Sequence, residues 1–300
     1  MRIAESAKKN HVPIIISNLV CNYVDWEPNR SVFCNSGRAR KQHFANLFRE
    51  GRAFERQENY EAALKVYQEA LSICNSFAEV YFRQGKIYEI LKKYEKAWDA
   101  FQKANDYDAF PTYAVSPQND FIQSLGHFDH VHVVDSLTYF REHSKDSLLD
   151  EDLIIDSVHP NLEGYLLLSE AIAEKIHSLF SSADEHLKPL DAETAKTVFH
   201  LDDSKMFEVY YQTGRWVTRL ATWHYDPENR LEIAEHFFRK AIEVKPIRNE
   251  GYLGLAVIAL LRKDGVKAEE FLKKARALDL ESTEEYLHNP WIYKIIRRAK

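Results

Sequence analysis

The chain has 300 residues, of which 45% are hydrophobic, and this is enough for one large domain or two modest ones. Its formal net charge of -6 offers no broad basic surface, so we expect no nucleic-acid partner. No apolar run is long enough to span a bilayer, and residues 1–10 are charged and amphipathic, which favours a cytoplasmic protein and leaves an upstream signal or anchor open.

The cysteines give no sign of a disulfide framework or of a zinc site. Cys21, Cys34 and Cys74 are odd in number and lack Cys-x-x-Cys spacing. We therefore expect all three to be reduced, structural thiols. No carboxylate or cysteine completes a recognisable ligand spacing with the histidines between residues 127 and 132, so we expect no metal and no cofactor.

A low content of glycine and proline, 9 of each, favours a predominantly helical chain. Two apolar runs are exceptions and predict strands. Val12 to Asn18 follows a short amphipathic helix at Ile3 to Lys9, and His130 to Asp135 is the second run. Buried runs of this kind are typical of parallel strands, so we expect a small parallel α/β segment in a chain that is otherwise all-α.

From Phe44 onward the pattern becomes a helical repeat. Small and bulky residues recur 34 positions apart: Gly51, Ala63, Tyr67 and Ala70 return as Gly85, Ala97, Phe101 and Ala104. A period of 34 is that of tetratricopeptide (TPR) repeats, in which small residues let paired helices cross closely. We therefore predict an inserted TPR pair at residues 44–108.

A second set of repeats occupies the C-terminal part. Three residues recur 34 positions apart: Ala234, Phe238 and Ala241 return as Ala268, Leu272 and Ala275. The final helix has an apolar face at Ile292, Ile295 and Ile296, with Arg297 and Arg298 outward, as a solenoid cap requires. We predict C-terminal TPR-like helical repeats with a capping helix at residues 186–300.

The inner helices of a TPR pair build a concave surface. The positions expected on that surface are Phe48, Arg52, Arg56, Phe82, Lys86 and Ile90. This basic and apolar lining favours an acidic peptide with a hydrophobic anchor, and the alternative is that the charges are merely solvated. The sequence predicts a protein or peptide ligand in this groove.

The stretch from Asp156 to Tyr165 carries the residues most suggestive of chemistry. Asp156 precedes His159 by three residues, so its carboxylate can sit behind the imidazole, fix the tautomer and leave the other nitrogen free as a base. Pro160 keeps His159 out of helical geometry, and Asn161 can cap the helix that follows. A helix-start turn without chemistry is the alternative.

The pattern Asp-x-x-His-Pro-Asn-x-x-Gly-Tyr in this stretch resembles the last block of the SGNH (GDSL-type) hydrolases, which cleave ester and acyl groups with a Ser-His-Asp triad. The likeness makes His159 the catalytic base and Asp156 the catalytic acid of that triad. Residues 22–29 resemble a stretch found after a late strand in SGNH proteins that carry TPR insertions, and Tyr23 and Val24 depart from it. By this likeness three asparagines are candidates for substrate binding: Asn22, Asn119 and Asn161.

The likeness implies a partial SGNH-like segment at residues 1–43 and 109–185. This segment has no Gly-Asp-Ser and no Gly-x-Asn-Asp motif, so the nucleophile and the oxyanion donors are missing from it. Two hypotheses remain: a TPR interaction scaffold with a catalytically incomplete segment, or part of an ester hydrolase whose Ser-bearing half lies upstream or on another chain. An uncovered strand edge at Pro13 to Asn18 further predicts self-association or pairing with that half.

Overall fold

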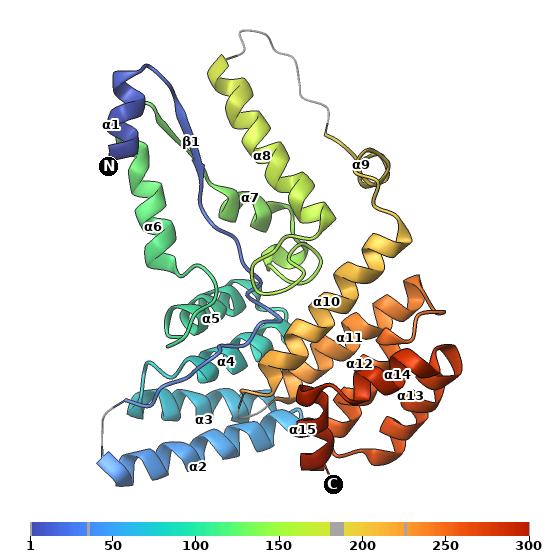
Figure 1. Ribbon diagram of the computed structural model, residues 1–300. Helices are drawn as coiled ribbons and strands as arrows, with labels where there is room; N and C mark the ends of the chain where they lie inside the picture. The colour runs from blue at the N-terminus through green and yellow to red at the C-terminus, as the bar shows by residue number, and fades with distance from the viewer. Residues whose placement is uncertain (1, 35–36, 181–188, 225–226, 300) are drawn as a thin grey trace. The chain divides into compact units, whose positions relative to one another are not determined.

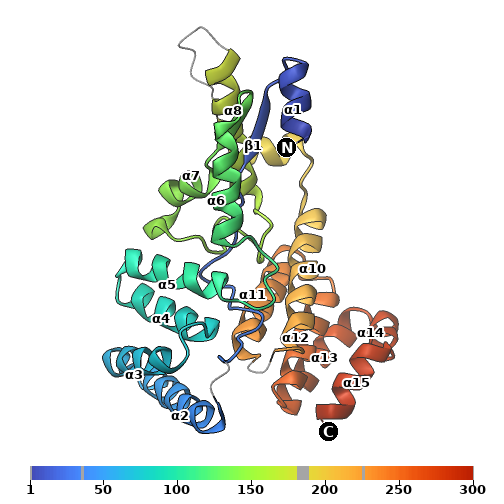
Figure 2. The same cartoon turned by 90° about the vertical axis from the view of Figure 1, so that its left-hand side faces the viewer.

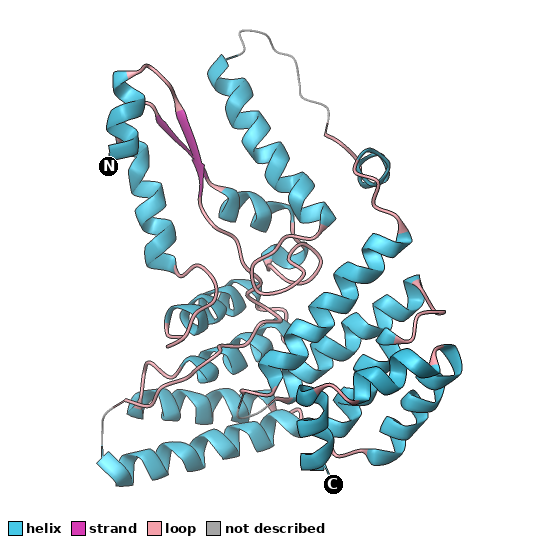
Figure 3. Ribbon diagram, in the orientation of Figure 1, coloured by secondary structure: helices cyan, strands magenta, loops and turns pink. Residues whose placement is uncertain are grey.

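The computed structural model describes residues 2–34, 37–180, 189–224 and 227–299. The chain divides into two compact units, Met1–Leu190 and Asp191–Lys300. The described residues form fifteen α-helices, two short 3-10 helices and two strands, so the chain is predominantly helical, as predicted (Figure 3). The domain boundary predicted at residues 185–186 lies outside the described residues. Among the described helices, none has the length and apolar composition needed to cross a membrane.

The first unit contains a small parallel sheet. Strands β1 (Ile14–Ser17) and β2 (Val131–Val134) pair in parallel, with Ile14 opposite Val131 and Ser17 opposite Val134. Both strands and their orientation were predicted. The helices near this sheet are α1 (Arg2–Lys9), α6 (Ser116–Ser124), α7 (Ser136–His143) and α8 (Leu162–Phe180), with 3-10 helices at Leu125–His127 and Lys145–Ser147 (Figure 1). Helix α8 packs against both strands.

Polar side chains fix the loops that follow the two strands. The Asn18 amide donates to Asp135 Oδ1 at 2.6 Å and accepts the backbone N–H of Leu137 at 2.9 Å. Asp135 also caps α7 by accepting the backbone N–H of Thr138. Buried polar groups such as the Asn18 amide need hydrogen-bond partners, and here the partners belong to the start of α7. The network therefore ties the C-terminal end of β1 to that helix.

Helices α2 (Gly37–Arg56), α3 (Tyr60–Ile73), α4 (Ala78–Ile90) and α5 (Tyr94–Asp106) form two hairpins that lie side by side (Figures 1 and 2). A Cβ added at Gly51 would lie 2.3 Å from the Tyr67 ring, and one added at Gly85 would lie 2.5 Å from the Phe101 ring. Residues 34 positions apart therefore occupy equivalent places in two helix crossings, one in each hairpin. Helix α2 begins seven residues before Phe44, where the repeat was expected to start.

The described residues of the second unit form helices and the turns that join them, without a strand. The helices are α9 (Ala192–Val198), α10 (Asp203–Ala221), α11 (Glu228–Val244), α12 (Glu250–Leu261), α13 (Gly265–Leu278), α14 (Leu280–Leu287) and α15 (Pro290–Ala299). Helices α10 and α11 pack as one pair, and α12 and α13 as another. The ring of Phe238 fills the space beside Gly214 and Gly254, where an added Cβ would come within 2.9 Å and 2.4 Å of it.

Helix α15 packs on α12, as a capping helix would. Ile292 and Ile295 form a buried cluster with Val257, and Leu260 and Leu261 border it. The apolar face predicted for the last helix is confirmed at these two isoleucines. The predicted positions of the Ile296, Arg297 and Arg298 side chains lie outside the described residues.

An extended segment, residues 21–34, runs along α4 and α5. Tyr23 packs on Trp98 with ring centroids 4.6 Å apart, and the Asn105 amide donates to Cys21 Sγ at 3.4 Å. The hydroxyl of Ser31 accepts the backbone N–H at the start of α4. The segment therefore belongs to the packing of the repeats rather than to a free loop.

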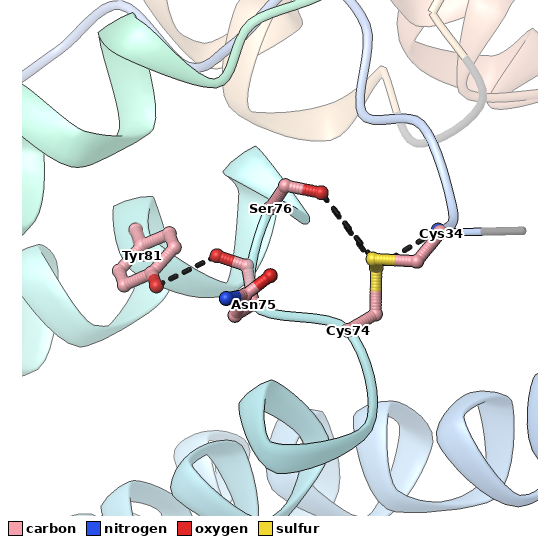
Figure 4. Close-up of a disulfide and its surroundings, with 5 residues drawn as sticks. All are labelled: Cys34, Cys74, Asn75, Ser76 and Tyr81. Carbon is pink, nitrogen blue, oxygen red and sulfur yellow. Dashed lines mark hydrogen bonds between the residues drawn. A yellow bond between two sulfur atoms is a disulfide. The ribbon is translucent and has the colours of Figure 1, made fainter. Parts of the chain in front are cut away.

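This segment ends in a disulfide between Cys34 and Cys74, whose Cα atoms are 5.4 Å apart (Figure 4). The hydroxyl of Ser76 lies 3.3 Å from Cys34 Sγ. The prediction of three reduced thiols is therefore wrong for this pair, because the fold brings together two cysteines that are 40 residues apart, and spacing along the sequence does not reveal such a pair. Cys21 is a buried free thiol, and burial raises its pKa to about 12.

Candidate functional site

Asp156 and His159 form the contact that the sequence predicts. His159 Nδ1 donates to Asp156 Oδ2 at 2.8 Å, and Asp156 Oδ1 accepts the backbone N–H groups of Val158 and His159 at 2.8 Å each. The Asp156 side chain is 13% exposed and the His159 side chain is 66% exposed. The carboxylate thus holds the imidazole in the tautomer that leaves Nε2 open to solvent as a proton acceptor.

Contacts of the local backbone hold this turn in place. Ile154 and Pro160 form an antiparallel bridge, and the Asn161 amide donates to the carbonyl oxygens of Glu151 and Asp152 at 3.1 and 2.7 Å. Asn161 Oδ1 accepts the backbone N–H of Gly164 at 2.9 Å, which confirms the predicted cap of α8. Gly164 is required here because an added Cβ would lie 2.2 Å from the carbonyl oxygen of Leu153.

Asn22 lies beside the same turn. Its backbone N–H donates to the Ser157 carbonyl at 3.1 Å, and its amide lies 3.2 Å from both the Ile154 carbonyl and Asp25 Oδ2. The structure thus brings Asn22 and Asn161 into the loops around the dyad of Asp156 and His159. Both amides are hydrogen-bonded to the main chain, and substrate binding by them stays a prediction.

Asn119 is not in hydrogen-bonding contact with these loops. Its amide clamps the backbone of Leu19, accepting the N–H and donating to the carbonyl at 2.9 Å each. The residue is buried in the fourth position of α6. This clamp positions the loop after β1, and a role of Asn119 in substrate binding stays a prediction.

The six residues predicted to line the TPR groove differ in accessibility. Phe82 is 1% exposed and packs on Phe101 with ring centroids 5.7 Å apart, so it contributes to helix packing. Phe48 is half-buried beside Phe77, at a centroid distance of 5.8 Å. Arg56 and Ile90 are exposed.

The two remaining groove residues, Lys86 and Arg52, each have a carboxylate partner on their own helix, and Arg52 has a second one on α4. Lys86 Nζ lies 2.6 Å from Glu89. Arg52 lies 3.6 Å from Glu55 and 3.7 Å from Glu79. The groove is therefore less basic than the sequence suggested, because carboxylates of the same unit offset its charges.

Arg52 belongs to a buried ionic network, which sequence reasoning missed. Arg83 Nε donates to Glu79 at 2.7 Å, and its other nitrogens lie 3.6 Å from Glu27 and 3.9 Å from Glu55. Burial lowers the pKa of Arg83, but these three carboxylates outweigh it and raise that pKa overall. Glu27 comes from the extended segment, which explains why the helical repeat alone did not reveal the network.

A cavity of about 460 Å³ in the second unit was also missed. Its polar and aromatic lining includes Gln212, Arg215, Trp216, Arg219, Asn289 and Trp291. The signal available in the sequence was a pair of arginines one helical turn apart beside a tryptophan on α10. Those residues precede the positions that define the repeat, so the 34-residue period draws no attention to them.

Comparisons with known proteins agree with the repeat. A family described as TPR repeat matches residues 51–92, and a family described as tetratricopeptide repeat matches residues 78–110. No curated protein matches the chain.

Three solved structures are similar to parts of the chain. YrrB, described as a TPR protein with an unusual peptide-binding site, is 16% identical, with 81% of this chain and 94% of that chain covered and a TM-score of 0.22. MamA (residues 41 to end) from Desulfovibrio magneticus RS-1 is 17% identical, with coverages of 79% and 96% and a TM-score of 0.23. The TPR2AB domain of yeast Sti1, solved in complex with pHSP90, is 13% identical, with coverages of 86% and 99% and a TM-score of 0.21.

The family models match a stretch of the first unit, and the helix crossings at Gly51 and Gly85 lie in the same stretch. The chain contains TPR repeats within residues 51–110.

Proposed function

We propose that the chain is a protein-interaction scaffold whose binding surfaces are its helical repeats. The observation that carries this proposal is the helix crossing repeated at Gly51 and Gly85, in the region that the TPR families match. Stacked helix pairs of this kind offer an extended inner surface for a peptide or a protein. The peptide-binding site named for YrrB supplies an analogy only.

The surface proposed in the first unit is the inner side of α2 and α4. Ile90 is 53% exposed there and Arg56 is exposed, so an apolar anchor and a cation remain accessible to a ligand. An acidic peptide with a hydrophobic side chain suits these two residues. The partial SGNH-like segment at residues 1–43 and 109–185 would then hold the TPR pair at residues 44–108 as an insertion.

Site-specific photo-cross-linking tests the scaffold. We expect benzoylphenylalanine at Ile90 to capture a discrete partner protein, and the same group at Gln68, exposed on α3, to capture none. Arg56→Glu combined with Lys86→Glu should weaken the capture at Ile90, because both substitutions reverse a charge on the inner surface. Equal capture at both positions, or none at either, would contradict the proposal.

The geometry of the dyad favours a second candidate function, ester or acyl hydrolysis. Asp156 and His159 are placed as the acid and base of a triad, with a carboxylate that is held by two backbone N–H groups. In this proposal the nucleophilic serine and the oxyanion donors come from a segment upstream or from another chain. The isolated chain should then show no hydrolysis of p-nitrophenyl acetate above background.

The test of this second candidate compares two histidines. If the chain is purified with its bound polypeptides and hydrolyses the ester, His159→Ala should lower the rate by about 100-fold or more, because a positioned base contributes at least that much. His143→Ala, at an exposed position on α7, should leave the rate unchanged. Equal losses in both variants would reject a catalytic role for the dyad.

Self-association through β1 is a further part of this proposal. Two paired strands are marginally stable alone, and an edge strand is a template for another strand. We expect light scattering to detect a dimer that Ile15→Lys dissociates, whereas a monodisperse monomer with slowly exchanging amides at Ile14 to Ser17 would reject it.

A further inference from the structure

The cavity in the second unit lies between α10 and the turn that joins α14 to α15. Its volume of about 460 Å³ is within the range of about 300 to 1,000 Å³ that is usual for ligand pockets. Phe238, Gly254 and Val257 form an apolar part of its lining. Arg215 and Arg219 contribute cationic groups from successive turns of α10.

The two arginines differ from four other arginines of this unit in their lack of a carboxylate partner. Within the described part of the chain, neither Arg215 nor Arg219 forms an ion pair. Four arginines outside the cavity each lie within 3.1 Å of a carboxylate: Arg239, Arg248, Arg262 and Arg276. Carboxylates therefore offset these four arginines, whereas the two that line the cavity have no such partner among the described residues.

Neutral groups contact the two guanidinium groups instead: each lies over an aromatic ring, and Arg215 also donates to Gln212 Oε1 at 3.1 Å. Arg215 lies over Tyr211 at 5.6 Å from the ring centroid, and Arg219 lies over Trp223 at 5.8 Å. Two like charges four residues apart on a helix repel each other. A carboxylate between them would relieve this repulsion and accept the planar, paired hydrogen bonds that guanidinium groups favour.

The cavity also presents aromatic side chains to solvent. Trp216 is 47% exposed and Trp291 is 36% exposed, and both line it. Partly exposed tryptophans beside arginines are typical of residues that dominate protein interfaces. An aromatic side chain of a ligand could stack on these rings while its neighbouring carboxylate meets the arginines.

We propose that this cavity binds an acidic peptide segment in which an aromatic residue is flanked by Glu or Asp. The carboxylate contacts Arg215 and Arg219, and the aromatic ring packs against Trp216 and Trp291. The proposal rests on the scaffold function and names the ligand class of one of its surfaces. Nucleic acid is disfavoured because two guanidinium groups in a chain of net charge -6 offer too few phosphate contacts.

Fluorescence anisotropy tests the ligand class directly. The probe is a fluorescein-labelled peptide of eight residues with one phenylalanine between two glutamates, titrated with the full chain. We expect binding that weakens in high salt, and a loss of about tenfold or more with Arg215→Gln or with Arg219→Gln. A matched peptide with glutamines should bind at least about tenfold more weakly, and one with alanine for phenylalanine should also bind more weakly.

Arg239→Gln is the control variant, because it removes the same charge from α11 at a position that is already paired with Glu235. It should change the affinity by less than about twofold. Equal losses in the control and cavity variants would overturn the proposal, since they would indicate a general charge effect. Tighter binding of a single-stranded oligonucleotide of equal charge would also overturn it.

A selection from a random peptide library on the immobilised chain separates this proposal from the scaffold function. Enrichment of acidic, aromatic peptides that disappears in the Arg215→Gln, Arg219→Gln double variant would support the cavity assignment. Enriched peptides without acidic residues, or enrichment unchanged in the double variant, would overturn the cavity and leave the scaffold intact. No enriched peptide at all would count against both.

Discussion

The two helical units complete their repeats in different ways. In the first unit, the extended segment 21–34 packs on α4 and α5 and contributes Glu27 to the buried network around Arg83. In the second unit, α15 packs on α12 through Ile292 and Ile295, and the ion pairs lie nearer the surface. One unit is closed by polar contacts and a disulfide, the other by the apolar face of a helix.

This difference predicts unequal sensitivity to substitution. A buried ionic network is stable only while each charge keeps its partners, whereas an apolar interface loses stability in proportion to the side-chain atoms that are removed. Helix pairs of the same kind can thus depend on single residues in the first unit and on distributed contacts in the second. Hydrogen exchange of peptides from each unit measures the stability of the two units separately.

The largest effect is expected from Arg83→Ala. The substitution removes the cation that faces the buried Glu27 and Glu79, so we expect unit 1 to lose about 3–5 kcal/mol of unfolding free energy. Arg239→Ala, at an exposed ion pair of the second unit, should cost less than about 1 kcal/mol. Similar losses for the two variants would remove the basis of the comparison.

The next effect concerns the disulfide between Cys34 and Cys74. Its removal by a Cys34→Ser, Cys74→Ser double substitution should lower the unfolding free energy of unit 1 by about 2–4 kcal/mol, because the unfolded chain regains the freedom of a closed loop. A reducing agent should have the same effect on the unmodified chain and none on the double variant. Protection of the second unit should not change in either case.

Gly85→Ala and Gly254→Ala test the close contact between a glycine and an aromatic ring that both units contain. The new Cβ would meet the Phe101 ring, and in Gly254→Ala it would meet the Phe238 ring, so each substitution should cost about 1–3 kcal/mol in its own unit. Gly265→Ala is the control, since no atom lies within 4 Å of its Cβ. Chemical denaturation of each variant gives the free energies, and a neutral Gly85→Ala would show that the crossing is not tightly packed.

The smallest effect is a difference in pH dependence. Burial, together with the charges of Asp25 and Asp152, raises the pKa of Asp150 in unit 1 to about 6. Its contribution to stability is therefore complete below pH 3.8 and is lost as the pH rises towards 6. Glu235 and Glu250 in the second unit behave oppositely: burial raises their pKa, but hydrogen bonds from arginines lower it overall, so their contribution is lost as the pH falls below 4.5.

Asp150→Asn isolates this contribution. The amide can still accept the backbone N–H of Asp152, so we expect unit 1 to be more stable near pH 7 and its stability to become less dependent on pH between 4 and 6. Thermal unfolding at a series of pH values measures both. An unchanged pH profile of unit 1 would show that Asp150 is not the group responsible.

Local patterns in the sequence predicted much of the fold. Spacing by 34 residues located the helix crossings at Gly51 and Gly85, and apolar runs located β1 and β2. The contact of Asp156 with His159 was predictable because three residues of one turn determine it. Each of these features depends on residues that are close in the sequence or on a strict period.

The features that were missed depend on residues that meet only in the folded chain. Cys34 reaches Cys74, and Glu27 reaches Arg83, because the segment 21–34 follows the repeats, and no periodic pattern specifies its path. Phe82 appeared to be a groove residue by counting along the helix, yet its ring is buried against Phe101. Counting along a helix predicts the side on which a residue lies but not which neighbouring side chains cover that residue.

The carboxylate of Asp108 has a consequence for the modularity of the first unit. It accepts the backbone N–H groups of Asn29 and Arg30 at 2.7 and 2.9 Å, and the N–H of Ala109 donates to the Arg30 carbonyl at 2.9 Å. The segment that precedes α2 and the segment that follows α5 are therefore hydrogen-bonded neighbours. Because Glu27 and the disulfide between Cys34 and Cys74 also join the preceding segment to these helices, the repeats are an integral part of the first compact unit rather than a separately exchangeable module.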